Sequence, residues 1–252
     1  MSSPELEVEK DERIYPFSRG ILARSILPTG LSLDSIYDIV EEVRTHFAGA
    51  KSAIPAADIH EKVADILDQK DLFDEKRRFR LSRKIEQNEK PLVILLGGTS
   101  GIGKSTIAAA LTRRLGIERV IGTDEVREVM RYMLPQDLVP TLHQSSYDAG
   151  EVLSGPEFPE NLLVGFSRQA SLVNRGVHAY IKRIEKEGLK AIFNGVHLVP
   201  GILDLDKYQS VQFFHYILTL ENKEEHIRRF LFRAKGSYRD AGRYIDRIDR
   251  IR

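Results

Sequence analysis

A glycine-rich stretch directly after a run of apolar residues constrains this chain more than any other feature. Residues 92–106 read LVILLGGTSGIGKST, which contains the pattern Gly98-x-x-x-x-Gly103-Lys104-Ser105. Glycines let the backbone curl so that successive N–H groups point into one anion-sized hollow, and the helix that begins there directs its positive end to the same place. The pattern therefore predicts a phosphate-binding loop between a buried strand and a helix.

The chemistry of each position in this motif matches the binding of ATP. Lys104 is predicted to reach the β- and γ-phosphates and to act in catalysis, and the Ser105 hydroxyl is predicted to ligate Mg²⁺. Backbone N–H groups supply most of the remaining contacts. The residues predicted to contact the nucleotide are Gly98, Thr99, Ser100, Gly101, Ile102, Gly103, Lys104, Ser105 and Thr106.

From Pro91 onward, short apolar runs alternate with amphipathic segments, which is typical of a parallel α/β sheet. The fold class predicted for residues 91–252 is a P-loop NTPase sheet flanked by helices. Its strands are expected at residues 92–96, 119–122, 191–193 and 211–220. A complete sheet of this class usually has five parallel strands, so we expect this kinase domain to lack its C-terminal strand.

The first ninety residues have a different pattern and predict a small, mainly helical domain over residues 1–90. A strand and turn are expected at residues 7–14. Ser18 is expected to cap a helix that ends before Pro28. Two further helices show one apolar face each, at residues 34–47 and from Ile59 to Leu67. The charged stretch 71–90 predicts a solvated helix.

Composition narrows the class of protein. The chain has no cysteine among its 252 residues, which excludes disulfides and thiolate metal sites. No apolar run reaches the length of a membrane span, and the polar N-terminus does not match a signal peptide. We therefore expect a soluble, cytoplasmic protein with no membrane partner. High charge without Cys or Trp also weakly indicates a thermophile.

The segment after the second expected strand reads IGTDEVREVMR and contains a candidate acceptor site. In small-molecule P-loop kinases the end of this strand faces the acceptor, where a carboxylate can take the proton of the acceptor hydroxyl. Asp124 is placed for that role. Arg127 and Arg131 follow on one side of a helix, which suits a substrate with a carboxylate or phosphate. The alternative is that Thr123 or Asp124 only caps the helix.

The third expected strand ends in the sequence AIFNGVHLVPG. Many relatives of this fold have an acidic residue at this point that orients Mg²⁺ or its water, whereas this chain has Asn194. An amide carries no charge, so more of the metal role is expected to fall on Ser105 and Asp124. His197 is a candidate for contact with the substrate, although a lone histidine is more often a structural residue.

Positive charge concentrates at the end of the chain, where residues 226–252 hold nine basic and three acidic residues. Arg229 and Arg233 share a helix face and are predicted to approach the transferring phosphoryl group as a helical lid closes. A solvated basic face is the alternative. Nucleic-acid binding is not expected, because Asp240, Asp246 and Asp249 interrupt the basic residues.

These segments together resemble 2-phosphoglycerate kinases. The resemblance rests on GGTSGIGKST, GTDEVREVMR, HQSSYDAG at residues 143–150, NGVHLVPG and HIRRFLFRA, in this order over residues 91–252. It implies the reaction of ATP with 2-phosphoglycerate to give 2,3-bisphosphoglycerate, which feeds cyclic 2,3-diphosphoglycerate in methanogenic archaea. The family usually has Glu where this chain has Asn194.

The segment VEKDERIYPFSRGILARSI at residues 8–26 resembles an ATP-cone, a small nucleotide-binding regulatory module. A helical cap without a ligand is the alternative for this domain. For the whole chain, two other functions stay open. One is a P-loop kinase for a nucleoside, a nucleotide or a sugar acid, and the other is a non-catalytic ATP sensor. The sequence is also compatible with a homo-oligomer.

Overall fold

The computed structural model describes residues 6–153, 161–234 and 241–251. The chain divides into two compact units. The first unit comprises the residues up to Asn88 together with Arg113–Gly116. The second comprises Glu89–Thr112 and the residues from Ile117 onward. Within the described parts of the chain, no helix has both the length and the apolar character needed to cross a membrane.

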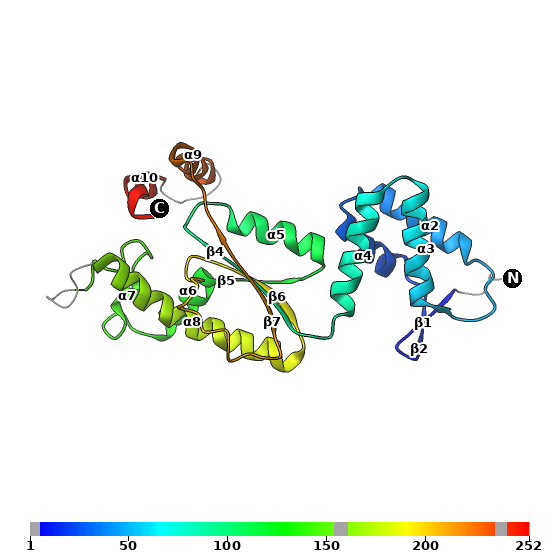
Figure 1. Ribbon diagram of the computed structural model, residues 1–252, viewed down its shortest axis with the longest axis horizontal. Coiled ribbons are helices and arrows are strands. Elements are labelled where there is room, and N and C mark those ends of the chain that lie inside the picture. Colours follow the sequence, from blue (N-terminus) through cyan, green and yellow to red (C-terminus); the bar gives the residue numbers. More distant parts are fainter. Residues whose placement is uncertain (1–5, 154–160, 235–240, 252) are drawn as a thin grey trace. The chain divides into compact units, whose positions relative to one another are not determined.

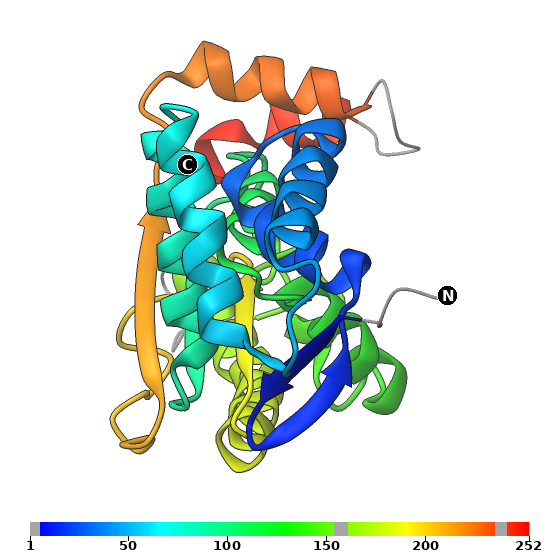
Figure 2. The ribbon, with the colours of Figure 1, turned by 90° about the vertical axis from the view of Figure 1, so that its right-hand side faces the viewer.

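The N-terminal unit combines a small sheet with helices. Strand β1 pairs antiparallel with β2 and parallel with β3, which gives the order β2-β1-β3. Figure 2 faces this unit and shows the β1–β2 hairpin in dark blue. Its elements are β1 (Glu7–Lys10), β2 (Arg13–Pro16), α1 (Arg19–Ile26), the 3₁₀ helix η1 (Leu27–Thr29), α2 (Leu33–His46), β3 (Ile54–Pro55), α3 (Ala56–Gln69) and α4 (Phe73–Gln87).

Local sequence signals explain where the first helices begin. The Ser18 hydroxyl accepts a hydrogen bond from the backbone N–H of Ile21 at 3.3 Å, as expected for the cap of α1. Ser32 caps α2 in the same way by accepting from the N–H of Ser35 at 3.2 Å. Each hydroxyl satisfies a backbone donor that has no partner inside the helix.

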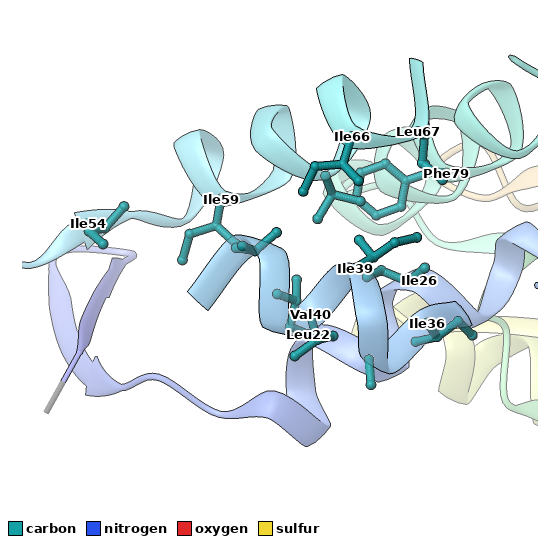
Figure 3. Packing of buried hydrophobic residues seen from close by; sticks show 13 residues of the cluster. Leu22, Ile26, Ile36, Ile39, Val40, Ile54, Ile59, Ile66, Leu67 and Phe79 are labelled. Carbon is teal, nitrogen blue, oxygen red and sulfur yellow. The ribbon is translucent and has the colours of Figure 1, made fainter. Parts of the chain in front are cut away.

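The core of this unit lies between helix faces with period 3.6 (Figure 3). One stripe from α2 packs against one stripe from α3, and the ring of Phe79 from α4 adds to them. The two stripes match the apolar positions that the sequence predicted. They consist of Ile36, Ile39, Val40 and Val43 on α2 and of Ile59, Val63, Ile66 and Leu67 on α3.

The second unit is a parallel α/β sheet of the predicted class, with the strand order β5-β6-β4-β7. Helices α5 and α8 lie on opposite faces of this sheet (Figure 1). Its elements are β4 (Leu92–Gly98), α5 (Lys104–Leu115), β5 (Arg119–Gly122), α6 (Thr123–Met133), α7 (Pro140–His143), α8 (Asn161–Glu187), β6 (Lys190–Asn194), β7 (Gln212–Leu218), α9 (Lys223–Ala234), α10 (Ala241–Asp246) and α11 (Ile248–Ile251).

Burial explains why β4 occupies the interior of the sheet. Residues 91–97 are all buried, as expected for a strand with neighbours on both sides and helices on both faces. Val93 and Leu95 pack with Val177 and Ile181 of α8. The described residues 241–251 form two short helices, α10 and α11.

The register of the strands determines where the site lies. Leu96 of β4 is opposite Asn194 of β6, and Asn194 is in turn opposite Gly122 of β5. Gly98 is opposite Leu218 of β7. The carboxyl ends of all four strands therefore lie at one edge of the sheet, which is where ligands bind in open α/β folds.

Candidate active site

The loop between β4 and α5 has the curled backbone that the glycine pattern predicted. Gly98, Gly101 and Gly103 have positive φ values of 131°, 81° and 100°. Residues other than glycine are disfavoured at positive φ because their Cβ atom clashes with the backbone. Of the residues predicted to contact the nucleotide, 98–103 form the loop, and Lys104, Ser105 and Thr106 lie in the first turn of α5.

Two adjacent glycines are also required by close packing. A Cβ atom on Gly97 would meet the carbonyl oxygen of Leu198, and one on Gly98 would meet the carbonyl oxygen of Leu218. Both obstacles are backbone atoms that cannot turn aside. The sequence Gly97-Gly98 therefore lets β4 end close to the chain that follows β6 and to the end of β7.

Lys104 is oriented toward the loop rather than toward solvent. The residue is only 8% exposed, and its Nζ atom donates to the carbonyl oxygen of Thr99 at 2.5 Å. This hydrogen bond keeps a positive charge beside the loop. An ammonium group in this position can pair with the terminal phosphates of a nucleotide.

Ser105 and Asn194 meet at the ends of neighbouring elements. The Ser105 hydroxyl donates to the Asn194 Oδ1 atom at 3.1 Å. The pair supplies a hydroxyl oxygen and an amide oxygen, which are hard donors suited to Mg²⁺ or to its bound water. Among the described residues, no group of three His, Cys, Asp or Glu side chains is arranged to hold a metal ion. The residues fit a Mg²⁺ ion that depends on nucleotide phosphates and water for most of its ligands.

Asp124 lies at the start of α6 and does not cap it. The N-cap is Gly122, whose N–H donates to Glu125 Oε2 at 3.4 Å. The Asp124 side chain is 70% exposed, and its Oδ1 atom lies 3.7 Å from Arg127 Nε. The carboxylate that the sequence singled out is thus free of a capping role and lies beside a guanidinium group.

The two arginines of α6 differ in their surroundings. Arg127 is 15% exposed in its side chain and donates through Nη1 to the carbonyl oxygen of Gln144 at 2.5 Å. Arg131 pairs with Glu128 at 2.9 Å. The Nε atoms of both arginines are buried and have no hydrogen-bond partner within the described ranges. An anionic substrate would therefore have to bind through the other N–H groups of each guanidinium group, or after a rearrangement of the side chain.

His197 is buried and engaged at both ring nitrogens. Nδ1 lies 2.8 Å from the Thr123 hydroxyl, and Nε2 lies 3.1 Å from Gln169 Oε1. The Gln169 amide nitrogen donates to the carbonyl oxygens of Thr141 at 2.6 Å and Gln144 at 2.9 Å, so its oxygen faces the histidine as an acceptor. His197 therefore donates through Nε2 and accepts at Nδ1 from Thr123.

This arrangement changes the interpretation of His197. The residue is 0% exposed, so the predicted direct contact with substrate has no support in this conformation. Its network instead holds Thr123, the first residue of α6, and thereby the helix that carries Asp124 and Arg127.

Burial and three of the candidate charges affect the pKa of His197. Burial lowers this pKa to about 4, Asp124 opposes the shift, and Arg127 and Lys104 add to it. Three predicted site residues from α5 and α6 therefore act on one buried imidazole. The ring is neutral at physiological pH, in agreement with the tautomer that its partners require.

The predicted lid arginines are only partly described. Arg229 of α9 donates through Nη1 to the carbonyl oxygen of Ile102 at 2.7 Å and through Nε to Glu225 at 3.1 Å. It thus contacts the phosphate-binding loop from outside. Arg233 belongs to the same helix, but its side chain lies outside the described residues.

Three buried polar residues of the site went unpredicted from the sequence, namely Gln169, Asn174 and His226. Gln169 and Asn174 lie on α8, next to the apolar positions Ala170 and Val173. Asn174 donates to the carbonyl oxygen of His197 at 3.1 Å. A polar side chain beside an apolar stripe is the only local signal for such residues, and it does not reveal the partner.

A parallel sheet with a glycine-rich loop between β4 and α5, a buried lysine and a carboxylate directly after β5 defines the class of P-loop kinases. Comparison with known proteins agrees, because the Zeta toxin family matches residues 77–147. Longer matches are found with 2-phosphoglycerate kinases. The protein from Pyrococcus furiosus is 40% identical over 97% of this chain and 80% of its own length.

Relatives in other archaea match over similar lengths. The 2-phosphoglycerate kinase of Methanocaldococcus jannaschii is 39% identical over 94% of this chain and 76% of its own length. That of Methanopyrus kandleri is 36% identical over 94% of this chain and 73% of its own length. The chain belongs to the 2-phosphoglycerate kinase family, and it is an ATP-dependent phosphotransferase.

Proposed function

We propose that this chain transfers the γ-phosphoryl group of ATP to the free hydroxyl of 2-phosphoglycerate. The products are ADP and 2,3-bisphosphoglycerate, the precursor of cyclic 2,3-diphosphoglycerate. The observation that carries this proposal is the identity of 40% with a 2-phosphoglycerate kinase over 97% of the chain. The agreement of the site with the chemistry of this acceptor supports it further.

The acceptor has a carboxylate, a phosphate and one free hydroxyl, and the residues of α6 offer a partner for each. Asp124 takes the hydroxyl proton as the acceptor oxygen bonds to the γ-phosphorus and the bond to the bridging oxygen of ADP breaks. Arg127 and Arg131 bind the anionic groups. The distance of 3.7 Å between Arg127 Nε and Asp124 Oδ1 supports this assignment, because one small acceptor could reach both side chains.

Lys104 and the backbone N–H groups of residues 98–103 bind the terminal phosphates in this proposal. Ser105 is the protein ligand of Mg²⁺, with Asn194 beside it at 3.1 Å. When bound, the ion neutralises charge on the β- and γ-phosphates. Arg233 and Arg229, which contacts the Ile102 carbonyl in this conformation, are proposed to stabilise the transferring phosphoryl group once the helical lid closes.

His197 and its partners hold the start of α6, so their proposed role is to position Asp124 and Arg127. His197 is 0% exposed and hydrogen-bonded at both ring nitrogens, which supports a positioning role over direct binding.

We retain the division into residues 1–90 and 91–252. For the first part we propose an ATP-cone-like regulatory module on the resemblance of residues 8–26. ATP and a phosphorylated glycerate are cytoplasmic metabolites, so we assign the activity to the cytoplasm.

The proposal is tested by supplying labelled ATP and Mg²⁺ with a panel of acceptors. The panel contains 2-phosphoglycerate, 3-phosphoglycerate, glycerate, a nucleoside and a nucleoside monophosphate. We expect phosphoryl transfer to 2-phosphoglycerate, and we expect the Lys104→Ala variant to lose it. Arg127→Ala should raise the KM for the acceptor about tenfold or more, because a charge-assisted hydrogen bond is lost. Transfer to a nucleoside alone would overturn the proposal.

A further inference from the structure

One face of helix α9 contacts three consecutive residues of the phosphate-binding loop. His226 Nε2 lies 2.7 Å from the carbonyl oxygen of Ser100, and Arg229 Nη1 donates to that of Ile102 at 2.7 Å. Between them, a Cβ atom on Gly101 would lie 2.7 Å from the ring of Phe230. The three residues of α9 are spaced i, i+3 and i+4, so they lie on the same side of the helix.

The direction of these contacts matters for anion binding. When successive backbone N–H groups point into the hollow of such a loop, the carbonyl groups between them must point outward. Because a carbonyl oxygen only accepts, the His226 Nε2 atom carries a hydrogen and donates it. Two loop carbonyls are thus held by side-chain donors from α9, that of Ser100 by His226 and that of Ile102 by Arg229.

The aromatic part of this contact is itself held in place. The Phe230 ring stacks on the His226 ring with centroids 5.0 Å apart and an angle of 19°. On Tyr244 of α10 it stacks at 4.9 Å and 16°. Tyr147 meets Tyr244 edge-on at 5.8 Å. His226 and Phe230 are 1% and 3% exposed, so this side of the loop is covered by packed rings and not by solvent.

We propose that α9 is a positioning element for the phosphate-binding loop and that His226 is its principal residue. By holding the loop carbonyls outward, His226 and Arg229 keep the N–H groups directed at the triphosphate before it arrives. Preorganised donors bind more tightly because they lose less conformational freedom on binding. This inference depends on the assignment of residues 98–105 as the triphosphate site and not on the identity of the acceptor.

The test measures the dissociation constant of ATP with Mg²⁺ by calorimetry, without any acceptor. His226→Ala should weaken ATP binding at the loop about tenfold, in line with the loss of one buried hydrogen bond and of ring packing. His226→Gln keeps a donor and should recover most of the affinity. Arg228→Ala is the matched control, because its side chain on the same helix is 69% exposed and should leave affinity unchanged.

A double-variant cycle separates positioning from a general loss of structure. If His226 and Arg229 hold the same loop, the loss of ATP affinity in the double variant should be smaller than the sum of the two single losses. The KM for the acceptor should change less than twofold. Thermal melting of each variant checks the fold. Full affinity in a folded His226→Ala variant, or an equal loss in His226→Gln and His226→Ala, would overturn the proposal.

Lys104→Ala shows whether the role of α9 or the triphosphate site itself has been assigned wrongly. The ATP binding that this variant loses is the binding that belongs to the loop. If Lys104→Ala weakens ATP binding and His226→Ala does not, only the role of α9 is wrong. If neither variant changes ATP binding, the assignment of residues 98–105 as the triphosphate site is wrong as well.

Discussion

At the scale of single residues, the acceptor side of the site is organised by one exposed carboxylate beside a largely buried guanidinium group. The Asp124 side chain is 70% exposed and that of Arg127 is 15% exposed, with 3.7 Å between the nearest charged atoms. An exposed carboxylate is accessible to a substrate hydroxyl, whereas the arginine is held by the carbonyl of Gln144. Proton acceptance and anion binding are thus assigned to different side chains.

Asp124→Asn should lower kcat by about 10²–10⁴-fold, because an amide cannot accept the proton of the acceptor hydroxyl. The KM for ATP should change little, since the nucleotide is bound by the other side of the site. Steady-state kinetics with 2-phosphoglycerate measure both constants. Asp137→Asn is the control, as it removes an exposed carboxylate outside the predicted site. A kcat within twofold of the unsubstituted protein would contradict the role of Asp124.

The buried imidazole of His197 couples folding to pH. Its pKa is about 4 in the folded chain, below the ordinary value of 6.5, so the unfolded chain binds more protons between these values. Its contribution to stability is present above pH 6.5 and is lost as the pH falls through 4. A shift of this size corresponds to roughly 3 kcal/mol.

His197→Gln should therefore reduce the loss of unfolding free energy between pH 6.5 and pH 4, measured by urea unfolding at several pH values. His60 of α3 provides the comparison, because burial also lowers its pKa to about 4. His60→Gln should remove a separate component that belongs to the N-terminal unit. If the pH dependence of His197→Gln equals that of the unsubstituted protein, the neutral buried state assigned to His197 is wrong.

At the scale of elements, α4 shows that a helix rich in charged residues can still contribute a side chain to a hydrophobic core. The helix is strongly charged, yet Phe79 is 1% exposed and belongs to the core of the N-terminal unit, whereas Phe73 is 61% exposed. The sequence predicted a solvated helix here, and most of its surface is indeed polar. The Phe79 ring packs with the stripes of α2 and α3, and the ion pairs Lys76–Asp68 and Arg80–Glu61 also connect α4 to α3.

Phe79→Ala should lower the free energy of unfolding of the N-terminal unit by about 3–5 kcal/mol, through lost burial and a remaining cavity. Phe73→Ala on the same helix should change it by less than about 0.5 kcal/mol. Urea unfolding followed by circular dichroism measures both. Equal effects of the two substitutions would show that α4 does not pack through Phe79.

At the scale of the whole molecule, the chain joins a P-loop kinase unit to a second compact unit of different architecture. If the N-terminal unit is an ATP-cone-like module, the protein has two nucleotide sites with separate determinants. Only the kinase site depends on Lys104, which belongs to α5.

The unsubstituted protein is therefore expected to bind two adenine nucleotides per chain and Lys104→Ala only one, measured by equilibrium dialysis with labelled ATP. The reason is that loss of the lysine removes the charge at one site and leaves the other unit unchanged. Complete loss of binding in Lys104→Ala would show that the N-terminal unit holds no nucleotide under these conditions.

The four strands of the second unit could be predicted because their signals are local, whereas β3 and α7 were not expected. The apolar run of β4, the three positive-φ glycines and the periodic stripes of α2 and α3 each depend on neighbours within a few residues. Helix α5 begins at Lys104 of the glycine-rich motif, as that motif predicted. The position of Asp124 after β5 was predictable for the same reason, since carboxyl ends of parallel strands share one edge.

The partners of the polar side chains could not be predicted in this way. Ser105 and Asn194 are 89 positions apart, and Arg229 and Ile102 are 127 positions apart. No local period relates such pairs, and the choice among donors depends on which buried groups would otherwise lose hydrogen bonds. His197 is the clearest case, because only its burial and its two partners distinguish a positioning residue from a substrate ligand.

By itself, the sequence determined that this chain forms a phosphate-binding loop on a parallel sheet, because glycine conformation and apolar periodicity act over a few residues. Only the tertiary structure decided that His226 and Arg229 hold that loop and that His197 holds α6. Those contacts exist because folding buries carbonyl and imidazole groups together, and each buried polar atom then requires a partner from a distant part of the chain.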